Sequence, residues 1–147
     1  MGNKVFIIAE IGPNHNGSYK KAVKMVNLLK NSGVNAIKFQ LANPNKVYSQ
    51  NAFKARYQIN NTGNSSIIEM SKKNQLTESE HLKISKLCKK LNIKYMCSAF
   101  DLDSLIFLDK KIKVPIFKIA SGEVFSIDML KYLSKKNKPI FLSTGMS

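Results

Sequence analysis

Apolar residues form five short, nearly continuous runs along the chain, and stretches with helical spacing separate these runs. The runs cover residues 4–10, 35–40, 93–100, 114–121 and 138–147. Continuous apolar runs bounded by turn residues are typical of strands buried on both faces of a parallel sheet. The pattern therefore predicts an α/β fold in which strand and helix alternate four times before a fifth strand.

The expected helices carry their own start and stop signals. From Ser18 to Asn31 apolar residues recur at helical spacing, and Gly33 follows as a natural C-cap. Thr77 and Glu80 form a capping-box pattern at the start of the next helix. Two further helices are expected over residues 101–111 and 126–137.

Residues 41–76 interrupt this alternation. They are rich in Asn, Ser, Gln and Lys and show no firm period. Loops of this length in a compact domain are usually functional or disordered. We therefore expect an irregular polar segment between the second strand and the helix that begins near Thr77.

Two architectures fit alternating strands and helices: a doubly wound open sheet and a (β/α)₈ barrel. No G-x-G-x-x-G pattern follows the first strand, and polar residues stand at the C-terminal ends of several strands. In a barrel those ends surround one active site, so the pattern favours the barrel. Because a complete barrel needs about 250 residues, this chain of 147 residues should hold about half: four βα units and a fifth strand.

Charged residues interrupt three of the apolar runs, at Glu10, Lys38 and Lys118. Side chains alternate between the two faces of a strand. Phe39 and its apolar neighbours should pack on helices, which leaves Lys38, Gln40 and Lys118 facing inward. These charges are therefore expected to converge on one side of one end of the sheet.

Two ammonium groups near several serine hydroxyls suit a ligand that carries a phosphate and a carboxylate. A second interpretation is structural, because a buried lysine without an anion is costly and either lysine could pair with Glu10 or Glu123. A third is a Schiff-base lysine, as in class I aldolases. The pattern favours anion binding and leaves the other two open.

Composition narrows the choice of partners and compartment. The net charge is +15, but Arg56 is the one arginine, and proteins that read bases favour arginine, so no specific nucleic-acid partner is expected. No apolar run approaches 18 residues and no cleavable leader is evident, so we expect no membrane span and a cytoplasmic location.

The cysteines and histidines predict no metal site. Cys88 and Cys97 match no zinc or redox spacing and are expected to be two reduced core thiols. We expect His15 to be bonded to backbone in its turn and His81 to face solvent.

Five segments, in this order and spacing, resemble the sialic acid synthase family, which includes the N-acetylneuraminate, legionaminate and pseudaminate synthases. The resemblance covers nearly the whole chain. The segments are IIAEIGPNHNGS, AIKFQ, LTESEHLKISKLCKKLNIKYMCSAFD, FKIASGE and PIFLSTGM.

This resemblance implies a (β/α)₈ barrel followed by a small antifreeze-like domain, in a homodimeric enzyme of carbohydrate, lipopolysaccharide or capsule biosynthesis. It also implies a transferase that condenses phosphoenolpyruvate with an N-acetylhexosamine aldehyde, with Mn²⁺ or Mg²⁺, to form a nine-carbon α-keto acid sugar. The 41–76 segment would lie over the barrel mouth and influence sugar selectivity.

Carried over by resemblance, Lys38 and Lys118 are the expected phosphoenolpyruvate clamps. The same comparison gives Glu10 and Glu123 as catalytic carboxylates, and Gln40 and Glu123 as sugar contacts. Hydroxyl donors to phosphoenolpyruvate are expected at Ser98, Ser121 and Ser143.

The family's two metal-binding histidines correspond to positions beyond Ser147, so this chain is expected to hold no metal ligand. We expect residues 1–147 to be the N-terminal part of a synthase barrel, without the other half barrel or the antifreeze-like domain, and to be catalytically silent. A Schiff-base barrel aldolase or lyase and a non-catalytic phosphate-binding fragment remain the alternatives.

Overall fold

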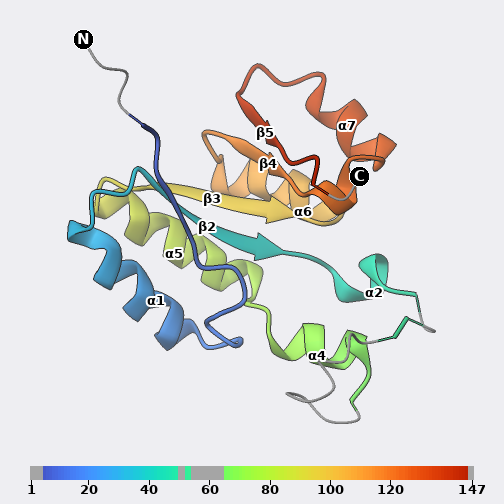
Figure 1. The fold of residues 1–147 in the computed structure, drawn as a ribbon, viewed down its shortest axis with the longest axis horizontal. Helices are drawn as coiled ribbons and strands as arrows, with labels where there is room; N and C mark the ends of the chain where they lie inside the picture. The colour runs from blue at the N-terminus through green and yellow to red at the C-terminus, as the bar shows by residue number, and fades with distance from the viewer. Residues whose placement is uncertain (1–4, 50–51, 54–64, 146–147) are drawn as a thin grey trace.

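Five parallel strands form one curled sheet in a computed structural model that describes residues 5–49, 52–53 and 65–145. The strands lie side by side in chain order, as Figure 1 shows. A doubly wound sheet would reverse its strand order at a switch point, so this order confirms the expected half barrel. The strands are β1 (Ile8–Glu10), β2 (Ala36–Leu41), β3 (Lys94–Ala99), β4 (Phe117–Ile119) and β5 (Ile140–Leu142).

Helices connect each strand to the next. The long helix α5 begins at the expected capping box, in which the Thr77 hydroxyl accepts a hydrogen bond from the backbone N–H of Glu80. The described helices are α1 (Tyr19–Leu28), η1 (Leu29–Asn31), α2 (Pro44–Val47), α4 (Ile67–Lys73), α5 (Glu78–Lys90), α6 (Leu102–Phe107), η2 (Leu108–Ile112), η3 (Ser121–Glu123) and α7 (Ile127–Leu133). No helix in this part of the chain is long and apolar enough to cross a membrane.

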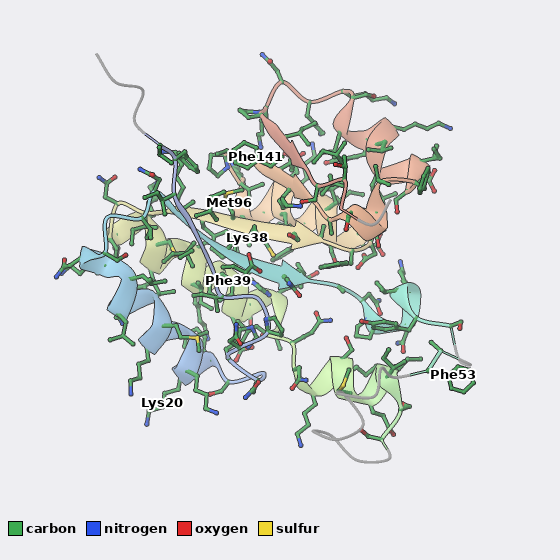
Figure 2. All side chains as sticks on the ribbon, viewed as in Figure 1. Lys20, Lys38, Phe39, Phe53, Met96 and Phe141 are labelled. Carbon is green, nitrogen blue, oxygen red and sulfur yellow. The ribbon has the colours of Figure 1, made fainter. Side chains whose placement is uncertain are left out.

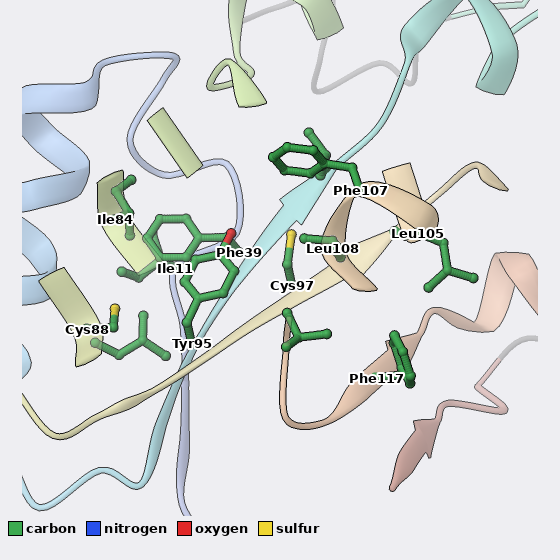
Figure 3. Packing of buried hydrophobic residues seen from close by; sticks show 14 of the residues in the cluster. Ile11, Phe39, Ile84, Cys88, Tyr95, Cys97, Leu105, Phe107, Leu108 and Phe117 are labelled. Carbon is green, nitrogen blue, oxygen red and sulfur yellow. The ribbon is translucent and has the colours of Figure 1, made fainter. Parts of the chain in front are cut away.

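The main core lies between the convex face of the sheet and helices α1 and α5 (Figure 1). Phe39 of β2 is fully buried there, beside Tyr95 of β3 and Ile84 of α5 (Figure 3). Burial of each such side chain contributes about 1.5–3 kcal/mol to folding. Because Phe39 faces the helices, its neighbours Lys38 and Gln40 must face the concave side.

The concave side carries a smaller apolar layer below the charged residues. Ala36, Met96 and Ile116 are buried together, and Ile8 packs against them. Figure 2 labels Met96 and Lys38 on the side of the sheet away from Phe39. Layers of side chains inside a closed wall of strands are characteristic of the (β/α)₈ barrel.

The segment 41–76 is less irregular than expected, because it contains the short helices α2 and α4. Asn43 caps α2, with Pro44 in its first turn. A capping box between Ser66 and Glu69 starts α4. Helices of one or two turns are too short to show a clear period in the sequence, which is why the pattern missed them. Residues 50–51 and 54–64 of this segment lie outside the described residues.

The prediction that His81 faces solvent is wrong. Its side chain is fully buried, and its Nδ1 lies 2.6 Å from the hydroxyl oxygen of Tyr95. Position 81 is three residues before Ile84 and seven before Cys88, so it belongs to the helix face that packs on the sheet.

The expectations for the other histidine and for the thiols are confirmed. The backbone N–H of Gly17 donates to Nδ1 of His15 over 3.1 Å. Cys88 and Cys97 are both free and buried.

Candidate active site

The residues expected to carry chemistry occupy two adjacent levels of the concave face. In the lower level Glu10 is in register with Lys38. In the upper level Gln40 is in register with Ser98, which is in register with Lys118 of β4. The period of two along each strand therefore places the five residues on one face from four strands. The sequence pattern predicted this for Glu10, Lys38, Gln40 and Lys118, whereas Ser98 was expected by resemblance.

Lys38 and Glu10 form a salt bridge across β1 and β2. The Lys38 side chain is 16% exposed and that of Glu10 is 43% exposed. The Gln40 amide nitrogen donates to Oε1 of Glu10 over 3.5 Å. The structural interpretation, in which a lysine pairs with Glu10, thus holds for Lys38.

The lack of a side chain at Gly12 leaves space for the side chains of Glu10 and Gln40. A Cβ at residue 12 would lie 3.1 Å from Oε1 of Glu10 and 3.4 Å from Nε2 of Gln40. The backbone φ of +51° at this position also favours glycine. A glycine in the turn after β1 therefore leaves room for the Glu10 and Gln40 side chains.

Lys118, unlike Lys38, has no carboxylate partner among the described residues. It is half-buried, and its Nζ contacts the backbone carbonyl of Ile119. Burial, followed by the nearby Lys38 ammonium, lowers the pKa of Lys118, and Glu10 partly opposes this shift. The Lys38 ammonium thus adds to the effect of burial on Lys118, and both lysines face the same concave side of the sheet.

The remaining predicted residues surround the same end of the sheet. Ser98 is buried on β3. Ser121 and Glu123 form η3 directly after β4, where the Glu123 carboxylate accepts a hydrogen bond from the Ser126 hydroxyl. Ser143 follows β5, and its backbone N–H donates to Ile119. Within the described structure no hydrogen bond joins Ser121, Glu123 or Ser143 to the two lysines, so their roles stay predictions.

A cavity of about 970 Å³ opens beside Gln40, beyond the C-terminal ends of β1 and β2. We call it the acceptor cavity. Its walls come from the turn after β1, the end of β2, α2, α4 and Phe100. Sequence reasoning identified Gln40 but missed Asn16, Tyr48, Glu69 and Asn74, which also line it. The Ser66–Glu69 capping pattern was the one signal that could have located the α4 wall.

The described residues hold no cluster of three or more His, Cys, Asp or Glu side chains that could bind a metal ion. Glu10 is the carboxylate beside the lysines, and it already forms a salt bridge with the Lys38 ammonium. The residues present therefore do not fit a divalent metal site.

Comparison with known proteins agrees with this geometry. Residues 25–147 match the model of the NeuB family. The chain is 39% identical to N,N'-diacetyllegionaminic acid synthase of Campylobacter jejuni, over 98% of this chain and 43% of that protein. It is 33% identical to N-acetylneuraminate-9-phosphate synthase of Drosophila melanogaster, over 98% of this chain and 38% of that protein.

The fold matches a solved structure of the same kind. The N-acetylneuraminic acid (sialic acid) synthetase of Leptospira borgpetersenii, crystallised with citrate, superposes with a TM-score of 0.79 at 30% identity, over 99% of this chain and 46% of that one. The chain thus spans less than half the length of these relatives and matches their N-terminal part. On the family model and on these relatives, the chain belongs to the NeuB family of sialic acid synthases.

Proposed function

We propose that this chain carries the phosphoenolpyruvate-binding part of a sialic-acid-type synthase. The observation that supports this most strongly is that Lys38 of β2 and Lys118 of β4 both face the concave side of the sheet, while Lys118 has no carboxylate partner among the described residues. Phosphoenolpyruvate carries a phosphate and a carboxylate on three carbons, and lysine is a common phosphate partner. Lys38 and Lys118 together are called the lysine site below.

In the proposed reaction, C3 of the enolpyruvate attacks the aldehyde carbon of an open-chain N-acetylhexosamine. The cationic C2 that results takes up water, and the proton that this water loses goes to the alkoxide formed from the aldehyde oxygen. Phosphate then leaves by cleavage of its C–O bond and takes the proton of the new C2 hydroxyl as the ketone forms, so the product is an α-keto acid sugar with nine carbons. The lysine site would hold the anionic groups of phosphoenolpyruvate, with hydroxyl support from Ser98, Ser121 and Ser143.

Glu10 is the proposed catalytic carboxylate. Its pairing with Lys38 keeps an anion beside the expected position of C2, where it would stabilise a developing cation or accept a proton from water. Glu123, which follows β4, is the second proposed catalytic carboxylate and is also a proposed sugar contact. Gln40 is the other proposed sugar contact, because it lines the acceptor cavity.

The complete synthase would also use Mn²⁺ or Mg²⁺, which polarises a carbonyl as a Lewis acid. The described residues do not fit such a metal site, so no step assigned to them depends on it. We propose that the chain alone binds phosphoenolpyruvate without condensing it, and that the complete enzyme is a cytoplasmic homodimer.

Titration calorimetry of the 147-residue chain with phosphoenolpyruvate tests the proposal. Lys118→Ala and Lys38→Ala should each weaken binding by about tenfold or more, because each removes a charge-assisted contact. Lys20→Ala is the matched control, since it removes the same charge from the exposed surface of α1 (Figure 2). Equal affinities in all four proteins would contradict the proposal.

One observation favours the Schiff-base alternative enough to test it. Burial and a neighbouring ammonium lower the pKa of Lys118, and both effects activate lysines that attack carbonyl groups. Borohydride reduction in the presence of pyruvate should leave the wild-type chain unlabelled under our proposal. Covalent labelling at Lys118, lost in Lys118→Arg, would support the aldolase alternative instead.

A further inference from the structure

Acidic side chains gather at one end of the half barrel, the end where the strands finish. All nine Asp and Glu residues of the chain lie within its described part. The lysine site and the acceptor cavity belong to this same end. Eight of the nine acids stand at the end of a strand or at the start of a helix: Glu10, Glu69, Glu78, Glu80, Asp101, Asp103, Glu123 and Asp128.

The opposite end of the half barrel carries lysines instead. Each of the four segments in which a helix ends and the next strand begins brings exposed lysines to the N-terminal ends of the strands (Figure 1). The ninth acid, Asp109, is buried at this end and is paired with Lys136 and Lys138. The other described lysines at this end are all exposed, and together we call them the basal face: Lys30, Lys89, Lys90, Lys94, Lys110, Lys111, Lys113 and Lys135.

The charge of the basal face is not compensated within the chain. None of its lysines forms a salt bridge in the described structure. The one acid nearby, Asp109, already contacts two other lysines. The basal face is therefore a broad positive surface that points away from the lysine site.

Helix dipoles explain only part of this distribution. They favour acids near the first turn of a helix and lysines near the last turn, and the effect falls off within that turn. Lys94, Lys113 and Lys135 lie outside the helices, in β3 or in the segments that lead into β4 and β5. The basal face thus extends beyond the positions at which a lysine stabilises a helix.

Exposed apolar side chains border the basal face. Val5, Phe6 and Ile7 directly precede β1, at the same end of the sheet, and all three are exposed. The Lys94 ammonium lies 5.8 Å from the centre of the Phe6 ring. Lysines beside exposed phenylalanine and aliphatic side chains suit a membrane interface, where the charges meet the headgroups and the apolar groups enter the boundary of the acyl chains.

We propose that the basal face binds the surface of an anionic lipid bilayer and leaves the mouth of the half barrel open to solution. Lipid headgroups are mobile anions, which flexible lysine side chains can meet without a fixed geometry. A nucleic acid is a less suitable partner, because rigid clamping of its phosphates favours arginine and the basal face has none. Peripheral contact of this kind needs no membrane-spanning segment.

Co-sedimentation with lipid vesicles tests the proposal. The probe is a phosphatidylcholine vesicle that contains about 30% phosphatidylglycerol, in about 0.15 M salt. The 147-residue chain should bind it about tenfold more tightly or better than a vesicle of phosphatidylcholine alone. Equal binding to the two vesicles, or no binding to the anionic one, would overturn the inference.

Two variants with the same net charge separate the basal face from the general positive field of the chain. The basal variant carries Lys90→Gln, Lys110→Gln, Lys111→Gln and Lys135→Gln. The control variant carries Lys20→Gln, Lys21→Gln, Lys72→Gln and Lys86→Gln, all at exposed positions outside the basal face. Binding to anionic vesicles should weaken about tenfold or more in the basal variant and about threefold or less in the control. Equal losses in the two variants would overturn the inference.

Acetylation of the wild-type chain tests the same face without any substitution. Bound anionic vesicles should slow the acetylation of the basal lysines about threefold or more, as followed by mass spectrometry of peptides. Lys20 and Lys72, which are exposed outside the basal face, should react as they do in the free chain. Equal protection of all these lysines would contradict the proposed orientation.

Two further measurements distinguish the bilayer from other anions. Lys118→Ala should bind the vesicles as tightly as wild type, because Lys118 faces the concave side and not the basal face. Loss of binding in this variant would place the headgroup in the lysine site and overturn the inference. A single-stranded RNA of mixed sequence should not displace the chain from the vesicles at equal concentrations of negative charge, and displacement would assign the basal face to nucleic acid instead. Phosphoenolpyruvate takes no part in these assays, so their outcome is independent of the proposed function.

Discussion

At the scale of single residues, the methyl group added by alanine at Gly17 should strongly destabilise the fold. Its φ is +71°, and an added Cβ would lie 2.1 Å from the carbonyl oxygen of Lys73. Gly17→Ala should therefore lower the free energy of unfolding by about 2–4 kcal/mol, through backbone strain and displacement of α4. Urea denaturation followed by circular dichroism measures this.

Gly33→Ala is the matched control for the effect of positive φ. Gly33 has a φ of +80°, but nothing lies within 4 Å of the position that a Cβ would occupy there. Its substitution should cost only about 1–2 kcal/mol, the strain of a left-handed alanine. Equal losses for both variants would show that Gly17 makes no critical contact with α4.

His81 should make stability depend on pH. Burial, with a smaller contribution from nearby His15, lowers the pKa of His81 to about 4, and Glu80 opposes the shift only partly. The Tyr95 hydroxyl, which contacts His81, and the Cys88 and Cys97 thiols that act on Tyr95 stay neutral over this range because burial raises their pKa values.

Because the folded pKa of His81 is lower than the unfolded value, its contribution to stability is complete above about pH 6.5. The contribution is lost as the pH falls from there towards about 4, by at most about 1.4 kcal/mol per pH unit. His81→Phe should show a shallower loss of unfolding free energy across this range. Parallel pH profiles for variant and wild type would contradict the assignment.

At the scale of elements, one buried carboxylate links η2, α7 and the segment that leads into β5. Asp109 accepts hydrogen bonds from the Tyr132 hydroxyl at 2.7 Å and from Lys138 at 2.9 Å, and Lys136 lies 2.8 Å away. Burial alone would raise the pKa of Asp109, but these three partners outweigh it and hold the pKa well below its usual range. Ion pairs and hydrogen bonds of Asp109, as well as apolar packing, thus stabilise the position of α7 and β5 against the rest of the half barrel.

Asp109→Asn should lower the free energy of unfolding by about 2–3 kcal/mol at pH 7, because it leaves two lysines without their anion. The carboxylate stabilises above its unfolded pKa of about 3.9, and the effect is lost as the pH falls towards the lower folded value. The difference from wild type should therefore narrow below about pH 4. The exposed Asp128→Asn is the control, expected to change stability by about 0.5 kcal/mol or less.

At the scale of the whole molecule, the sequence predicted the sheet and the convergence of Glu10, Lys38, Gln40 and Lys118. It could do so because strand side chains alternate strictly and because parallel strands end at one edge. It left open which lysine would pair with Glu10, since that depends on side-chain conformation across strands; the structure pairs Glu10 with Lys38 and gives Lys118 no carboxylate among the described residues.

The acceptor cavity also lay beyond sequence reasoning. Its walls join segments far apart in the chain, and its outer wall is α4, a helix of seven residues. Short helices give weak periodic signals, and their position is set by tertiary contacts such as Gly17 against Lys73. The wrong prediction for His81 followed from the many lysines near it in sequence. These lysines lie on other faces of α5, whereas His81 lies on the buried face with Ile84 and Cys88.

The most direct test of the shared anion site is the pKa of Lys118 with and without phosphoenolpyruvate. Heteronuclear NMR of the Cε and Nζ signals of labelled lysine, assigned with Lys118→Arg, measures it. We predict a lowered pKa in the free chain that rises when the ligand binds, because an anion at the lysine site stabilises the ammonium form. Binding of phosphoenolpyruvate that leaves the pKa of Lys118 unchanged would contradict a site shared by the two lysines.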